Sequence, residues 1–327
     1  MFSGKNVLVA GSSGFIGTNL MCRLLPLGAN IRATIHKKDV NRIIDERVEY
    51  VTCDLTQMED CRRVVRDMDY VFMCAANTSG AAVIQNTPLV HVTPNVIMNT
   101  QMLEAAYLAK VRKFVAISSG TIYPPRGDRP MKESEMFDGD PFVKYYPVGW
   151  MKRYMEVLCR MYSEMLPNPM TTVVLRPSNI YGPYDDFDFA TSHVTAALIR
   201  KVIERHDPLV VWGTGDNVRD LLYIDDFIDA MLIATERVST YYPINIASGK
   251  GYSVREILLA ILELDGYTNV RIEFDFSKPS MIPVMLLDTA RAEATLEFKA
   301  RTSLKEGLKR TIDWYRSTLS ISLECSA

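Results

Sequence analysis

Short apolar runs alternate along the chain with segments whose apolar residues recur at the spacing of a helix face. The runs predict six buried strands, at 7–10, 30–36, 48–55, 70–76, 113–117 and 171–175. Helical segments are predicted after residue 17, at about 58–68 and at 96–110. Residues 78–94 are rich in Thr, Ser, Asn and Pro, so we expect a loop there that is long enough to form a lid. The alternation of strands and helices predicts an α/β fold with a doubly wound parallel sheet.

Three glycines, Gly11, Gly14 and Gly17, separate the first strand from the first helix. In a Rossmann sheet the first such glycine allows a tight turn, the second lets a pyrophosphate approach the backbone, and the third lets the helix pack on the strand. The helix N-terminus then presents free N–H groups to the anion. Glycines also close ordinary βα turns, but this position at the start of the chain favours a dinucleotide site. The same turn contributes Ser13, Phe15 and Ile16.

The end of the second strand bears on the choice of cofactor. An NAD site usually has an acidic residue here for the ribose hydroxyls, whereas this chain has His36, Lys37 and Lys38. Cationic side chains can pair with a 2′-phosphate, which favours NADP over NAD. A solvated cluster of loop charges is the alternative.

Two further strand ends are candidates for cofactor contacts. Asp54, followed by Leu55, could accept a hydrogen bond from the adenine amino group, or it could N-cap the next helix. Ala75 and Ala76 end the fourth strand with small side chains. Small residues are needed where a backbone passes close to a nicotinamide ribose.

Composition narrows the range of partners. Lys and Arg number 37 and Asp and Glu 39, a formal charge of −2, which gives no electrostatic case for nucleic acid or an anionic membrane surface. No apolar run approaches the roughly 18 residues of a membrane span, and the early first strand predicts no signal peptide. The six cysteines and four histidines lack metal-ligand spacing. We expect a cytoplasmic protein with reduced thiols and no metal.

Five stretches occur together in the chain: the glycine turn, residues 118–124, Lys152, residues 176–183 and residues 219–226. In residue type, order and spacing, these stretches resemble the motifs of the extended short-chain dehydrogenase/reductase family. The resemblance extends from the first strand to about Tyr315. That family comprises NAD(P)-dependent nucleotide-sugar epimerases, dehydratases and reductases. Within it, residues 182–194 and 211–219 resemble the GDP-L-fucose synthases.

This resemblance implies an NAD(P)-dependent 3,5-epimerase and 4-reductase of a GDP-4-keto-6-deoxymannose type of substrate. A GDP-sugar is favoured, and a UDP- or dTDP-sugar epimerase of the same family is the alternative. A 4,6-dehydratase is less favoured, because that class follows its strand-end Thr with Asp-Glu, and here Gly120 and Thr121 follow Ser119. A degenerate NADP(H)-binding protein without turnover is the alternative from another class.

The chain departs from the family at three positions. The family pairs a catalytic Tyr with a Lys four residues later, but Val148 stands four residues before Lys152. Thr121 stands where the fucose synthases have a Cys that takes part in epimerisation. Val284 stands where many relatives have an Arg for the substrate diphosphate. Neither the family's mechanism of reduction nor the fucose synthases' mechanism of epimerisation can therefore be assigned to this chain without change.

The resemblance implies roles for several residues. It implies a catalytic group of Ser119, Thr121, Tyr123, Lys152 and His193, in which Lys152 also holds the nicotinamide ribose. Tyr123 could instead pack beneath the cofactor without chemistry, and His193 could be a capping or core histidine. Tyr145 and Tyr146 precede Val148 and are further candidates for proton transfer.

The remaining implied contacts concern the two ligands. Arg176 is expected to contact the cofactor, and the substrate is expected to meet Asn179, Val211, Trp212 and Arg219. Asn179 and Arg219 suit a diphosphate, since a planar guanidinium can bind phosphate through two hydrogen bonds. A turn amide and a surface charge are the alternative for these two residues.

The resemblance also implies a division of the chain. We expect a cofactor domain of residues 1–177 with about 220–248, a smaller α/β substrate domain of about 178–219 with 249–317, and a tail at 318–327. The donor sugar is expected between the two domains, at the carboxyl ends of the strands. Apolar stripes on the 96–110 and 150–165 helices suggest a homodimer through a helix bundle, as relatives form.

Overall fold

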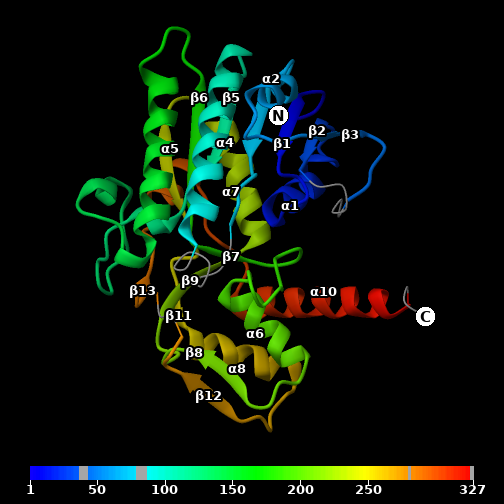
Figure 1. Cartoon of the computed structure of the whole chain (residues 1–327), viewed down its shortest axis with the longest axis vertical. Helices are drawn as coiled ribbons and strands as arrows, with labels where there is room; N and C mark the ends of the chain where they lie inside the picture. The colour runs from blue at the N-terminus through cyan, green and yellow to red at the C-terminus, as the bar shows by residue number, and fades with distance from the viewer. Residues whose placement is uncertain (37–42, 79–86, 279–280, 325–327) are drawn as a thin grey trace.

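The computed structural model describes residues 1–36, 43–78, 87–278 and 281–324. In that part of the chain, seven strands form a parallel sheet in the order β10-β6-β5-β4-β1-β2-β3 (Figure 1). The strands are β1 (Asn6–Ala10), β2 (Asn30–Ile35), β3 (Val48–Thr52), β4 (Tyr70–Met73), β5 (Lys113–Ile117), β6 (Thr171–Pro177) and β10 (Tyr242–Ile246). All six predicted strands are present, and β10 adds a seventh strand from the 220–248 segment that is expected in the cofactor domain.

Helices cover both faces of this sheet, which is why its strands are apolar on both sides. α1 (Phe15–Leu24) and α7 (Ile224–Arg237) pack on the face that includes Val7 and Val9. α2 (Met58–Val65), α4 (Pro88–Leu108) and α5 (Tyr146–Glu164) pack on the face that includes Leu8 and Ala10. The predicted doubly wound sheet is therefore confirmed.

The loop predicted over 78–94 is too long, because α4 already begins at Pro88. Proline is tolerated in the first turn of a helix, whose N–H groups have no partner there. Pro94 lies further inside and cannot donate to the carbonyl of Val90, but the Nδ2 of Asn77 donates to that oxygen at 2.9 Å. A side chain from a distant turn thus replaces the missing bond. The suspected lid includes residues outside the described part of the chain.

A smaller part of the molecule starts at the carboxyl end of β6, where the chain continues directly into β7 (Figure 1). Its sheets consist of β7 (Asn179–Tyr181), β9 (Val218–Tyr223), β11 (Gly251–Ser253) and β13 (Val284–Met285), and of the pair β8 (Leu209–Trp212) and β12 (Ile272–Asp275). Its helices are α6 (Val194–Ile203), α8 (Val254–Asp265) and α10 (Leu304–Glu324), whereas α9 (Ala290–Leu296) packs against α7 and β10 of the larger part.

The remaining elements are short. Three 3₁₀ turns lie between β5 and α5, namely η1 (Gly120–Ile122), η2 (Glu133–Phe137) and η3 (Val143–Tyr145). The segment expected as a tail from residue 318 continues α10 to Glu324. Among the helices that the structure describes, none combines the length and the apolar character needed to cross a membrane.

Candidate functional site

The glycine turn lies where the strand order of the large sheet reverses. β1 pairs with β2 on one side and with β4 on the other, and ligands of doubly wound sheets bind at such a point. Gly11 has a φ of +77°, and a Cβ built on it would lie 2.6 Å from the Cα of Ala75. A Cβ on Gly17 would lie 2.2 Å from the carbonyl oxygen of Gly11. Only glycine therefore fits at these two positions.

The N-terminus of α1 is open to an anion. Gly14 is its N-cap and offers no side chain to the first N–H groups, and the first turn has no acidic residue. The turn itself is fixed by Thr34 of β2, whose Oγ1 accepts a hydrogen bond from the N–H of Gly11 at 2.9 Å. The N–H of Ser12 donates to the carbonyl oxygen of Thr34 at 3.1 Å. No motif in the sequence marks Thr34 for this role.

Asp54 and His36 lie near each other at the ends of β3 and β2. Two hydrogen bonds from Thr56 and, to a lesser extent, the charge of His36 hold the pKa of Asp54 below its usual value. Asp54 does not N-cap α2, because that helix begins at Met58 after Gln57. Its carboxylate instead closes a turn on Thr56, with Oδ1 2.9 Å from the backbone nitrogen. Lys37 lies outside the described residues.

Ser119, Thr121 and Lys152 lie beyond the carboxyl end of β5. The Ser119 Oγ accepts hydrogen bonds from the backbone N–H of Thr121 at 3.2 Å and from its hydroxyl at 3.0 Å. Lys152 of α5 donates to the carbonyl oxygen of Ile117 at 2.7 Å. α5 comes this close because Gly149 has no side chain: a Cβ there would lie 2.7 Å from the carbonyl oxygen of Thr121. The structure therefore brings these three predicted residues together.

Val148 stands four residues before Lys152, and the two tyrosines that precede Val148 differ in exposure. Tyr146 is 49% exposed, and its ring packs edge-on against Trp150. Tyr145 is 9% exposed. Burial raises the pKa of the Tyr145 phenol, and the nearby charge of Arg219 opposes that rise. Of the two, Tyr145 is the tyrosine that faces the predicted substrate residues.

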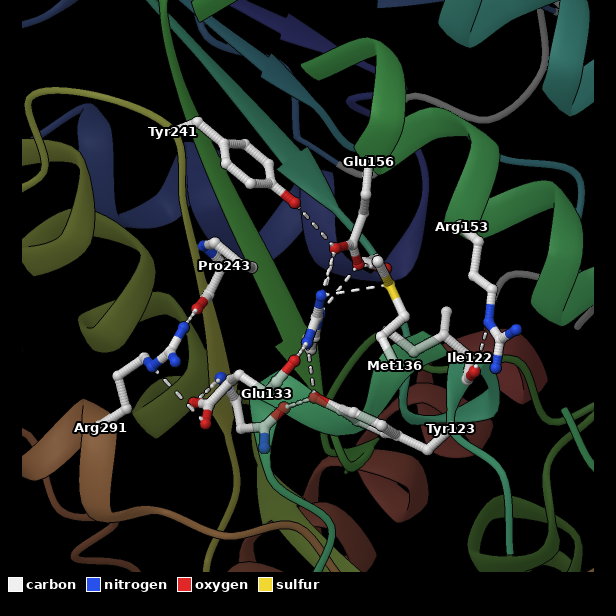
Figure 2. Close-up of polar contacts among 12 residues, drawn as sticks. Ile122, Tyr123, Glu133, Met136, Arg153, Glu156, Tyr241, Pro243 and Arg291 are labelled. Carbon is white, nitrogen blue, oxygen red and sulfur yellow. Dashed lines mark hydrogen bonds and ion pairs between the residues drawn. The ribbon is translucent and has the colours of Figure 1, made fainter. Parts of the chain in front are cut away.

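Arg176 and Tyr123 belong to a buried polar network. Figure 2 labels Tyr123, Glu133 and Glu156 of this network. Arg176 forms an ion pair with Glu156, with 2.5 Å between Nη2 and Oε2. It also donates to the hydroxyl oxygen of Tyr123 at 2.8 Å and to the carbonyl oxygen of Glu133 at 2.9 Å. The Tyr123 hydroxyl donates to Oδ1 of Asn245. Protein partners occupy polar atoms of both side chains, which favours a structural role for Arg176 and Tyr123 over the predicted cofactor contact and catalytic role.

Glu156 connects this network to Lys152, one turn earlier on α5. Burial lowers the pKa of Lys152 to about 8, and the Glu156 carboxylate works against that shift. Glu156 also accepts a hydrogen bond from the hydroxyl of Ser118, next to Ser119. The spacing of four residues from Lys152 was the available sequence signal for Glu156.

Arg219 of β9 is 7% exposed, yet no carboxylate forms an ion pair with it in the described part of the chain. Its Nη1 donates to the carbonyl oxygens of Val218 at 2.7 Å and Pro283 at 3.4 Å. Burial lowers the pKa of Arg219, and only Tyr145 opposes that effect. A buried guanidinium is normally paired, so this unmatched charge favours an anionic ligand.

The other predicted substrate residues divide into two groups. The Oδ1 of Asn179 is buried and has no hydrogen-bond partner in the described part of the chain, which leaves it available to a ligand. Trp212 is 41% exposed, with the ammonium of Lys278 5.8 Å from its ring centroid. Val211 is 2% exposed in the core between β8 and the helices. The Val211 side chain therefore packs in the core, and a substrate contact of Val211 stays a prediction that its backbone would have to meet.

His193 precedes α6, and its side chain remains exposed, without capping the helix. Desolvation by the surrounding protein lowers its pKa, the charge of Asp186 opposes this, and His91 adds to it. The direction of this shift favours the neutral ring, which is the form that can accept a proton. Sequence reasoning missed His91, because a single histidine in a loop-like segment carries no pattern.

The properties of the described cysteines are those of structural residues. Burial raises the pKa of Cys53 to about 11 and that of Cys61 and Cys74 to about 12. Thiols of this kind are poor nucleophiles near neutral pH. No group of three or more His, Cys, Asp or Glu residues in the described ranges is arranged to hold a metal ion.

The chain is similar to known proteins in both sequence and structure. The chain is 28% identical to the GDP-L-fucose synthase of Escherichia coli (strain K12), with 96% of this chain and 97% of that protein covered. It is also 28% identical to the probable GDP-L-fucose synthase 1 of Oryza sativa subsp. japonica, covering 95% and 92%. The structure of the UDP-glucose 4-epimerase of Thermotoga maritima with UDP-glucose superposes with a TM-score of 0.84 at 26% identity, covering 96% and 99%. Residues 7–247 match the model of the NAD dependent epimerase/dehydratase family, and the chain belongs to that family.

Proposed function

We propose that this protein is an NAD(P)-dependent nucleotide-sugar epimerase and reductase that acts on a GDP-sugar, as its GDP-L-fucose synthase relatives are named to do. The substrate we favour is a GDP-4-keto-6-deoxymannose type of sugar nucleotide. The likeness to a UDP-glucose 4-epimerase supports a UDP- or dTDP-sugar as the alternative. Val148 supports the other alternative, a protein that binds NADP(H) without turnover.

The observation that carries the proposal is the buried, unpaired charge of Arg219. A second anion-binding point, the open N-terminus of α1, lies at the switch point of the large sheet. Two separate anion points fit two phosphate-bearing ligands, a dinucleotide and a nucleotide sugar. Asn179, with its unpartnered Oδ1, suits a hydroxyl or amide of the same substrate.

The residues present fit a dinucleotide cofactor. The close contact of Gly11 with Ala75 leaves no room for a side chain, and Gly14 gives the backbone an open approach. We assign the pyrophosphate to Gly14 and the first turn of α1, and the nicotinamide ribose to Lys152. His36, exposed at the end of β2, supports NADP through pairing with a 2′-phosphate. When bound, such a cofactor donates or accepts a hydride at the sugar.

The sugar chemistry depends on proton transfer by this chain's own residues. The neutral ring of His193 can remove a proton from the carbon beside a sugar ketone. The hydrogen-bonded hydroxyls of Ser119 and Thr121 can hold the ketone oxygen. Losing the family phenol costs about 10²–10⁴-fold in rate, so we expect slow reduction compared with a relative that has Tyr at position 148.

The domain division and the dimer belong to the same proposal. Residues 1–177 with 220–248 hold the cofactor, and 178–219 with 249–317 hold the sugar nucleotide. Trp150, Tyr154 and Val157 of α5 are exposed apolar residues at helical spacing. They support a homodimer in which the α4 and α5 helices of two copies pack together.

The test is proton exchange in D₂O. The protein is incubated with NADPH and GDP-, UDP- and dTDP-linked 4-keto sugars, and deuterium at C3 or C5 is measured by mass spectrometry. We expect label with the GDP-sugar and loss of label in His193→Asn. Label with a UDP- or dTDP-sugar alone would favour the first alternative. No label and no NADPH oxidation with any donor would favour the non-catalytic alternative.

A further inference from the structure

Asn77 holds the first turns of α4 against the carboxyl end of β4. Its backbone N–H donates to Oδ1 of Asn95 at 2.8 Å, and its carbonyl oxygen accepts from Nδ2 of Asn95 at 2.8 Å. Asn95 also donates to the carbonyl oxygen of His91 at 2.7 Å. These bonds, with that from Asn77 to Val90, fix the position of His91 relative to the sheet edge.

One nitrogen of the His91 ring has a defined partner. Nδ1 lies 3.0 Å from the carbonyl oxygen of Asn77. A carbonyl can only accept, so Nδ1 carries the hydrogen, and in the neutral ring Nε2 is a bare acceptor. The side chain is 3% exposed, and Nε2 is buried without a hydrogen-bond partner among the residues that the structure describes. Leaving such an atom unmatched costs about 1–3 kcal/mol, so it calls for an explanation.

The place of His91 supplies that explanation. β4 pairs in parallel with β5, with Met73 opposite Ala116. Asn77 and Ser119 therefore leave adjacent strands at the same edge of the sheet. The hydrogen bonds of His91 and Asn95 to Asn77 therefore hold His91 at the sheet edge where Ser119 also lies.

We propose that His91 contacts the sugar of the substrate, with Nε2 accepting a hydrogen bond from a sugar hydroxyl. This inference rests on the proposed function and extends it, because it assigns a sugar contact to a residue that no family motif marks. A neutral acceptor fixed by Asn77 recognises a hydroxyl at one ring position, so His91 would set sugar specificity and leave the nucleotide contacts unchanged.

The test compares the binding of a nucleotide sugar with the binding of the nucleotide alone. Titration calorimetry measures Kd for GDP-mannose and for GDP with wild-type protein, His91→Asn and His91→Phe. Asparagine keeps a donor for the Asn77 carbonyl and removes the Nε2 acceptor, whereas phenylalanine removes both. We expect His91→Asn to weaken GDP-mannose binding by roughly 3- to 10-fold and to leave GDP binding unchanged. His206→Asn, on the surface beside Glu204, is the matched control and should bind both ligands as wild type does.

The outcomes distinguish this inference from the proposed function. An unchanged ratio of the two Kd values in His91→Asn, with wild-type binding of GDP, would overturn the role of His91 alone. Wild-type protein that binds neither GDP nor UDP, with or without the sugar, would overturn the proposed function as well. If His91→Phe unfolds, His91→Asn still decides the question.

Discussion

Arg176 and Arg219 are both buried, but their surroundings differ. Arg176 has Glu156 beside it and donates to Tyr123 and Glu133, so its charge is matched within the protein. Arg219 donates to backbone carbonyls and has no paired carboxylate in the described residues. A third buried arginine, Arg153, also donates to backbone carbonyls and forms no ion pair in the described residues, but its guanidinium carbon lies 4.6 Å from the ring centroid of Trp150, and Asp140 and Glu156 oppose the fall in its pKa.

This difference separates a structural arginine from one that is available to a ligand. Desolvation disfavours the charge of either residue, and only Arg176 recovers that cost from a carboxylate. Sequence motifs assign both residues to ligands, since both lie in family stretches. The partners of each guanidinium in the folded protein, and not the sequence motifs, distinguish the roles of Arg176 and Arg219.

The largest expected effect is the loss of stability when Arg176 loses its carboxylate partner. Glu156→Gln leaves Arg176 as a buried charge without its partner, and we expect the free energy of unfolding to fall by about 3–5 kcal/mol in urea titrations. Glu164→Gln, which breaks an exposed pair with Arg160 on the same helix, is the control and should cost less than about 1 kcal/mol. Equal effects of the two variants would mean that the buried pair is not structural.

A smaller effect, on the affinity for GDP, is expected when a side chain close to Arg219 is changed. Tyr145→Phe removes one hydroxyl close to Arg219, and we expect GDP to bind about 2- to 10-fold more weakly by calorimetry. Tyr146→Phe removes the same atom from an exposed ring and should not change Kd. A loss in Tyr146→Phe, or none in Tyr145→Phe, would contradict the orientation of these two side chains.

The smallest effect concerns pH. The pKa of Lys152 is lowered to about 8, so its positive charge is lost as the pH rises through 8 and not near the usual 10.5. We expect NADPH to bind about fourfold more weakly at pH 8.5 than at pH 7 in fluorescence titrations. Lys152→Arg keeps the charge and should remove this dependence. A wild-type affinity that stays constant to pH 9 would show that Lys152 does not contact the cofactor.

Local patterns predicted most of the large sheet correctly. Strands that are buried on both faces are apolar throughout, and the glycines at 11 and 17 are required by contacts that any such turn makes. The start of α4 was missed because Pro94 is a helix breaker by rule, and its compensation by Asn77 comes from a turn elsewhere in the chain.

Residue roles that depend on distant partners could not be predicted. Arg176 meets Glu156 across 20 residues, and Tyr123 meets Asn245 across 122 residues. The side chain of Val211 lies on the face of β8 that packs into the core, and that core forms only when β8 pairs with β12. His91 lacked any motif, and its unmatched nitrogen is visible only when all its neighbours are known.

The central claim is that Arg219 is buried without a carboxylate partner because a nucleotide diphosphate pairs with it. The direct measurement is calorimetric titration of GDP and UDP into wild-type protein and Arg219→Met, with urea unfolding of both. We expect wild type to bind at least one nucleotide, and Arg219→Met to bind it at least about tenfold more weakly with equal or greater stability. Unchanged affinity, or a loss of stability as large as that of Glu156→Gln, would contradict the account.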